Sequence, residues 1–179
     1  MSWESLPRRV FLDSCVLQLL STYGEFVYDG GSLSPTDRIY QMPDGFRGLS
    51  ALRSLAIIAR HASFDWIASS GSIREAAGKA DAFHFSWVVE MVTYARSRPD
   101  AQGQRPSAIP VASRRQHGYL SHGDRGLIEE AFALSCDGFL TTDRRLAKNA
   151  GHLQHTTGIR LLSPLEYWEE LEPWAALFV

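Results

Sequence analysis

Four short apolar runs, separated by stretches with helical periodicity, constrain the fold of this chain more than any other feature. Val10, Phe11 and Leu12 form a run that is too continuous for a strand with one face in water. Such runs are typical of strands buried in parallel sheets. Strands that alternate with helices favour a parallel sheet covered by helices on both faces. We therefore predict an α/β fold with three layers (α/β/α) and a central, mainly parallel sheet. The predicted strands are Arg8–Leu12, Phe64–Ala68, Phe139–Thr141 and Ile159–Leu162.

The length of 179 residues suits one domain with a substantial core. A single domain over residues 1–179 is therefore predicted. Two segments rich in Gly, Pro, Ser or Asp interrupt the pattern of strands and helices. We interpret residues 24–48 as a loop or insertion and residues 97–118 as a flexible loop.

The location expected from the sequence is the cytoplasm. The first nine residues include Trp3, Glu4 and two arginines, which is unlike a signal peptide. No apolar run reaches the length that spans a membrane, so no membrane association is expected. Cys15 and Cys136 are far apart in the sequence, a pattern that favours reduced thiols over a disulfide or a zinc site.

Four carboxylates stand at positions where a parallel sheet would gather functional groups. Asp13 and Asp143 follow predicted strands, whereas Glu75 and Asp124 lie at or near the start of predicted helices. Ligands bind beyond the carboxyl ends of the strands in open α/β sheets. Taken singly, each Asp is a typical helix cap and Glu75 a typical solvated helix residue. Only their joint placement favours a functional site.

Carboxylate oxygens in such a cluster are the ligands that Mg²⁺ or Mn²⁺ prefers. Asp13, Glu75, Asp124 and Asp143 are therefore the candidate metal ligands and catalytic residues, and Ser14 and Thr141 are candidates for ordering them. Two carboxylates about 4 Å apart repel by roughly 4 kcal/mol at an effective dielectric constant of about 20. A metal-free cluster must therefore protonate one acid or recruit an arginine. We therefore expect Asp143→Asn to leave the metal-free fold as stable as the unmodified protein, or more so.

In four places, this sequence resembles the PIN-domain ribonucleases. The family's first strand ends in Asp followed by Ser or Thr, as in Leu12-Asp13-Ser14, and its second strand is followed by a helix with Glu, as at Glu75. An Asp then opens a helix with an Ala further on, as Asp124 and Ala131 do, and a strand ends in Thr-x-Asp, as in Thr141-Thr142-Asp143. The resemblance spans roughly Arg8 to Glu170. Cys15 stands where the family often has Asn.

The resemblance implies a metal-dependent endoribonuclease that hydrolyses RNA with Mg²⁺ or Mn²⁺ as cofactor. It also implies a possible role as the toxin of a toxin–antitoxin pair, with an antitoxin protein as partner and a homodimer as assembly. Segment 24–48 is longer than in the compact VapC-like toxins, so the nuclease chemistry is implied more firmly than the toxin role. Basic residues near the acids are candidates for contacts to the RNA backbone: Arg114, Arg115, Arg144, Arg145 and Lys148.

Two other functions are compatible with the sequence. One is a non-catalytic PIN-like module that binds RNA or a protein. The other is a phosphatase-like or receiver-like α/β protein in which a strand-end Asp is phosphorylated. That chemistry would require a Lys near the phosphate, and Lys79 and Lys148 are poorly placed for it.

Overall fold

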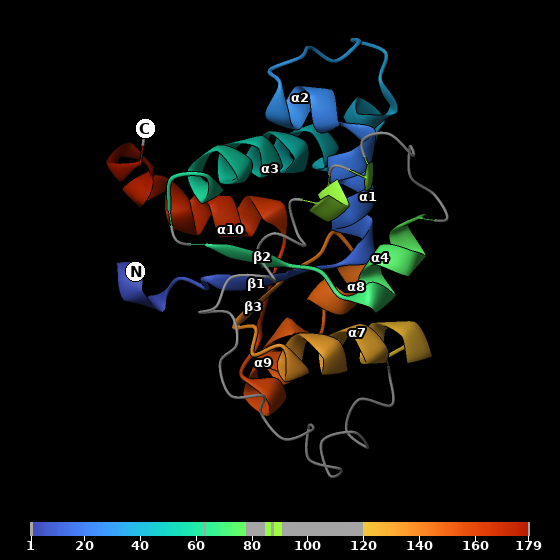
Figure 1. Ribbon diagram of the computed structural model, residues 1–179, viewed down its shortest axis with the longest axis vertical. Coiled ribbons are helices and arrows are strands. Elements are labelled where there is room, and N and C mark those ends of the chain that lie inside the picture. The colour runs from blue at the N-terminus through green and yellow to red at the C-terminus, as the bar shows by residue number, and fades with distance from the viewer. Residues whose placement is uncertain (1, 63, 78–84, 87, 91–119, 179) are drawn as a thin grey trace.

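The structure is a computed structural model that describes residues 2–62, 64–77, 85–86, 88–90 and 120–178. Its sheet has four parallel strands in the order β2-β1-β3-β4 (Figure 1). The strands are β1 (Arg9–Leu12), β2 (Asp65–Ile67), β3 (Gly138–Leu140) and β4 (Arg160–Leu162). The predicted α/β fold with a central parallel sheet is confirmed.

The two central strands are buried on both faces, as their continuous apolar runs indicate. Phe11 pairs with Ile67 of β2 and with Phe139 of β3. The rings of Phe11 and Phe139 stack with centroids 5.1 Å apart. All three side chains are fully buried. Burial on both faces requires a helical layer above and below the sheet.

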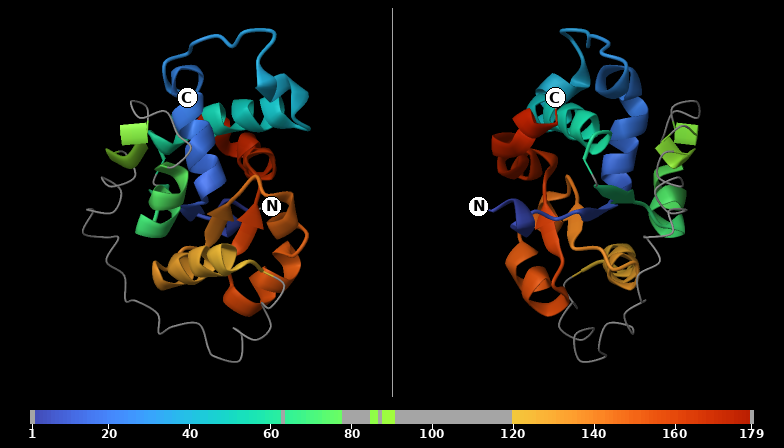
Figure 2. Two further views of the ribbon diagram at one scale, coloured as in Figure 1. Left: turned by 90° about the vertical axis from the view of Figure 1, so that its right-hand side faces the viewer. Right: turned by 60° about the vertical axis from the view of Figure 1, so that its left-hand side comes forward.

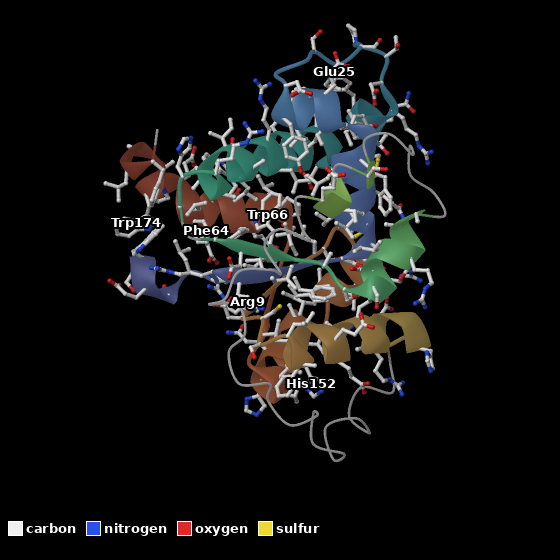
Figure 3. The ribbon with its side chains drawn as sticks, in the orientation of Figure 1. Arg9, Glu25, Phe64, Trp66, His152 and Trp174 are labelled. Atoms are coloured by element: carbon white, nitrogen blue, oxygen red, sulfur yellow. The ribbon has the colours of Figure 1, made fainter. Side chains whose placement is uncertain are left out.

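Two apolar clusters form these layers. The first lies between the sheet and three helices, α1 (Ser14–Thr22), α3 (Gly45–Ala59) and α10 (Pro164–Leu171) (Figure 1). Val10, Leu12 and Trp66 belong to this cluster, and Figure 3 labels Trp66. The second cluster lies on the opposite face of the sheet, where Phe11 and Ile67 meet three other helices (Figure 2). These helices are α7 (His122–Ala133), α8 (Arg144–Ala147) and α9 (Ala150–Thr157).

Helix α4 (Ser70–Ala77) follows β2 and contacts both α1 and α7 (Figure 1). It therefore joins the two helical layers at the carboxyl ends of the strands. Two of the predicted site residues lie on these helices, Glu75 on α4 and Asp124 on α7.

The prediction of a loop over residues 24–48 is wrong for much of that segment. It contains α2 (Gly24–Tyr28) and the 3-10 helix η2 (Arg38–Gln41), and α3 already begins at Gly45. Phe26 and Ile39 are buried in the first apolar cluster. The carboxylate of Asp37 caps η2 by accepting a hydrogen bond from the backbone N–H of Ile39 at 2.8 Å. Burial of these few apolar side chains orders a segment whose composition indicated a loop.

Helix boundaries in the C-terminal third also differ from the prediction. Helix α7 begins at His122, two residues before Asp124, because the hydroxyl of Ser121 caps it. Helix α9 contains Gly151 near its start and is capped by Gly158, whose φ is 77°. The described residues also include the 3-10 helices η1 (Trp3–Ser5) and η4 (Glu172–Leu177).

The predicted flexible loop at 97–118, with Arg114 and Arg115, lies outside the described residues. Among the helices that are described, none combines the length and the apolar character needed to cross a bilayer.

Candidate active site

Asp13 is buried at the end of β1, where it caps α1. Its side chain is 5% exposed, and its Oδ1 accepts a hydrogen bond from the backbone N–H of Ser14 at 2.6 Å. Its Oδ2 accepts hydrogen bonds from Thr141 Oγ1 at 2.5 Å and from the thiol of Cys15 at 3.0 Å. The hydroxyl of Ser14 lies 3.3 Å from Oδ1 and can donate to it. The buried carboxylate is therefore held by neutral donors on both oxygens.

The hydroxyl of Thr141 joins Asp13 to the loop that carries Asp143. Thr141 directly follows β3 and is buried, and it accepts a hydrogen bond from the backbone N–H of Asp143 at 3.0 Å. In turn, it donates to Asp13 Oδ2. The two strand-end acids predicted to lie near each other are thus connected through one side chain.

Asp143 is a helix cap as well as a candidate ligand. Its Oδ1 accepts a hydrogen bond from the backbone N–H of Arg145 at 2.7 Å, and its Oδ2 lies 3.3 Å from the guanidinium of Arg145. Partial burial tends to raise the pKa of this carboxyl group, but the hydrogen bonds and the charge of Arg145 outweigh it, and the pKa lies below its ordinary value. The carboxylate is therefore ionised at neutral pH. An arginine, rather than protonation, balances its charge.

Cys15 supplies a donor that the sequence did not point to. Burial, followed by the nearby charge of Asp13, raises the pKa of its thiol to about 12, against weaker opposing hydrogen bonds from Thr141 and Thr142. The thiol therefore stays protonated and donates to Asp13 rather than acting as a nucleophile.

Glu75 and Asp124 lie on the two helices that flank this centre. Glu75 is exposed on α4. Asp124 lies in the first turn of α7, where its Oδ2 accepts a hydrogen bond from the Ser121 hydroxyl at 2.7 Å. Between these helices, Glu130 of α7 lies against Gly71 of α4. A methyl group on Gly71 would lie 2.7 Å from Glu130 Oε2, a buried oxygen that has no hydrogen-bond partner within the described part of the chain.

Asp13, Glu75, Asp124 and Asp143 do not form one coordination sphere in this structure. Across the described residues, no group of three or more His, Cys, Asp or Glu side chains lies close enough to hold a metal ion. The structure brings Asp13 and Asp143 together through Thr141, and it leaves Glu75 and Asp124 on neighbouring helices. The carboxylates have the right chemistry for Mg²⁺ or Mn²⁺. However, both oxygens of Asp13 already accept hydrogen bonds, Oδ1 from Ser14 and Oδ2 from Thr141 and Cys15.

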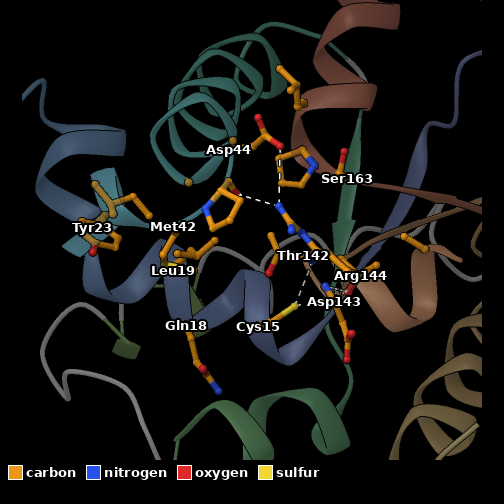
Figure 4. Close-up of a pocket in the computed structure, with 18 of the residues that line it drawn as sticks. Cys15, Gln18, Leu19, Tyr23, Met42, Asp44, Thr142, Asp143, Arg144 and Ser163 are labelled. Carbon is orange, nitrogen blue, oxygen red and sulfur yellow. Dashed lines mark hydrogen bonds and ion pairs between the residues drawn. The ribbon is translucent and has the colours of Figure 1, made fainter. Parts of the chain in front are cut away.

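A pocket of about 770 Å³ opens beside Thr141 and Asp143. Figure 4 shows the side chain of Arg144 extending from α8 across this pocket. Its guanidinium donates to the backbone carbonyl of Pro43 at 3.3 Å and lies 3.8 Å from the carboxylate of Asp44. Arg145 and Lys148, the other described cationic candidates, are exposed on the same short helix or directly after it.

Comparison with known proteins produced no match to a family model, to a curated protein or to a solved structure.

Proposed function

We propose that this chain is a PIN-like endoribonuclease that hydrolyses RNA phosphodiester bonds with Mg²⁺ or Mn²⁺. The observation that carries the proposal is the link Asp13–Thr141–Asp143 at the carboxyl edge of a parallel sheet. The hydroxyl of Thr141 joins the carboxylate of Asp13 to the backbone N–H of Asp143 there, and Thr141 and Asp143 line an open pocket. This is the edge at which α/β proteins bind ligands and perform chemistry.

Each residue has a role that follows from its surroundings. Asp143 is ionised and 25% exposed, so it presents a charged ligand to the solvent side of the site. Asp13 is buried more deeply than Asp143. The hydroxyl groups of Thr141 and Ser14 orient its carboxylate. When bound, the divalent metal would activate a water molecule and neutralise charge on the phosphate.

Glu75 and Asp124 complete the proposed set from α4 and α7. Arg144, Arg145 and Lys148 would hold the RNA backbone near the acids. The proposal includes a cytoplasmic location and, in its toxin form, an antitoxin protein and a homodimer.

One observation favours a second candidate, a non-catalytic PIN-like module that binds RNA. No three of the described acids lie within reach of a common ion. An RNA-binding module would not require them to do so.

Cleavage of mixed-sequence RNA with Mn²⁺ separates the two candidates. Asn caps helices about as well as Asp, so Asp143→Asn should fold and yet lose its metal ligand. We expect a loss of cleavage of at least about tenfold, because even residues that only orient a metal ligand contribute about 10–100-fold. Glu172→Gln, a change at an exposed acid far along the chain in η4, is the matched control and should cleave normally.

Two results would count against the nuclease. Equal cleavage by Asp143→Asn and the unmodified protein would remove the site assignment. Saturable RNA binding without Mn²⁺-dependent cleavage would favour the non-catalytic module instead.

A further inference from the structure

One side of the pocket beside Asp143 is built by residues 24–48, the segment whose composition indicated a loop or insertion. Residues 42–45 and Gly48 form one side of it, and α1, the loop between β3 and α8, and the start of α10 form the others (Figure 4). Its volume of about 770 Å³ lies within the range of small-ligand sites, roughly 300–1,000 Å³. The segment therefore encloses a space next to the proposed catalytic acids that could hold one small group.

One part of the pocket is apolar. Leu19, Tyr23, Ile39 and Met42 line it. The ring of Tyr23 is anchored, because its hydroxyl donates to the carboxylate of Asp37 at 2.9 Å. Burial and the interactions with Asp37 raise the pKa of Tyr23 to about 12, so its phenol is neutral at physiological pH. An anchored aromatic ring beside flexible apolar side chains suits the flat face of a nucleobase.

The other part of the pocket is charged, and both signs are present. Arg38 and Arg144 line it together with three acids, Asp44, Asp143 and Glu166, and the side chain of Arg144 reaches across it. Among the described residues, the guanidinium of Arg144 contacts the carbonyl of Pro43 and forms an exposed ion pair with Asp44. Exposed ion pairs contribute little, whereas a phosphate can accept two parallel hydrogen bonds from an arginine. A phosphate group can therefore replace Asp44 on Arg144.

We propose that this pocket binds one unpaired nucleotide of the RNA substrate, next to the phosphate that is cleaved. Its base lies against Met42 and Leu19, and its phosphate lies on the guanidinium of Arg144. The position follows from continuity, because Thr141 and Asp143 line the pocket and also belong to the acidic centre. This inference rests on the proposed nuclease function and identifies how that site would hold its substrate.

Binding of adenosine 5′-monophosphate without metal tests the pocket directly. Met42 is 46% exposed, so Met42→Trp should fold and fill the space meant for the base. We expect it to weaken binding about fivefold or more, the lower end of what base contacts contribute. Ile57 is similarly exposed, at 41%, on α3 and does not line the pocket. Ile57→Trp is therefore the matched control and should bind normally.

The phosphate contact has a separate test. Arg144→Gln should weaken binding of the monophosphate and leave binding of adenosine, which has no phosphate, unchanged. Equal weakening of both ligands would contradict a phosphate at Arg144. With RNA and Mn²⁺, Met42→Trp should raise KM and leave kcat nearly unchanged, because the pocket holds substrate and the acids perform the reaction.

The outcomes separate this inference from the nuclease proposal. Cleavage that depends on Asp143 but is indifferent to Met42→Trp would overturn the pocket alone. The pocket inference would also be overturned if the monophosphate showed no saturable binding. It would be overturned as well if Met42→Trp changed the oligomeric state of the chain without affecting nucleotide binding. Binding of the monophosphate that Met42→Trp and Arg144→Gln weaken, in a protein that does not cleave RNA, would support the pocket and overturn the nuclease.

Discussion

Replacing Thr141 with Val removes one hydroxyl and keeps the shape of the side chain. That hydroxyl donates to the buried carboxylate of Asp13 at 2.5 Å and accepts from the backbone N–H of Asp143 at 3.0 Å. A hydrogen bond to a charged group contributes about 1.5–3 kcal/mol, and a neutral one about 0.5–1.5 kcal/mol. Because Thr141→Val leaves both partners without this contact, we expect the free energy of unfolding to fall by about 2–4 kcal/mol. For a chain of this length, that corresponds to a Tm lower by about 4–16 °C.

Urea unfolding followed by circular dichroism measures this loss. Thr142 is the adjacent control, because its side chain is exposed and Thr142→Val should change stability by less than about 0.5 kcal/mol. Thr141→Ser keeps the hydroxyl and should recover most of the loss. If Thr141→Val were as stable as Thr142→Val, the hydroxyl would not hold the two acids, and the central observation behind the proposed function would fail.

Two further predictions concern the acids and the helices around them. The lowered pKa of Asp143 means that its ionised form stabilises the fold above the unfolded pKa of about 3.9, and that this contribution is lost as the pH falls through the lower folded pKa. Asp143→Asn should therefore be less stable than the unmodified protein at pH 7, which is the opposite of what we expected from the sequence. The difference in free energy of unfolding should shrink below about pH 4. A constant difference in urea unfolding from pH 7 to pH 3 would refute this reasoning. Gly71→Ala should destabilise the fold by about 0.5–1.5 kcal/mol, because its methyl group would force the carboxylate of Glu130, the end of a flexible side chain, to move. In a Glu130→Ala background, Gly71→Ala should instead stabilise the fold by up to about 1 kcal/mol through helix propensity. Thermal unfolding of the unmodified protein, the two single variants and the double variant tests this. Equal effects of Gly71→Ala in both backgrounds would contradict the contact with Glu130.

The central part of the fold could be predicted because its signals are local. The run Val10–Leu12 indicated a strand buried on both faces, and Phe11 indeed pairs with strands on either side. The parallel arrangement then placed the ends of β1 and β3 side by side, so Asp13 and Asp143 could be expected to lie near each other. Thr141 was expected, with Ser14, to order the acids through hydroxyl hydrogen bonds, and its hydroxyl does donate to Asp13.

The surroundings of the site could not be predicted in the same way. Arg144 meets Pro43 and Asp44 about a hundred residues away in the sequence, and no local pattern encodes that contact. The order within residues 24–48 depends on burying Phe26 and Ile39 against helices from elsewhere in the chain. The contact of Glu130 with Gly71 depends on how α7 lies on α4, which helical periodicity leaves open.

By itself, the sequence determined the class of fold, the buried parallel strands and the acids at their ends, because hydrophobic periodicity and strand direction act within a few residues. Only the tertiary structure decided which acids make contact, how charge is balanced on Asp143, and that the middle segment closes a pocket around Arg144. Those outcomes depend on the angle and separation of packed helices, which result from the side chains of many distant residues packing together.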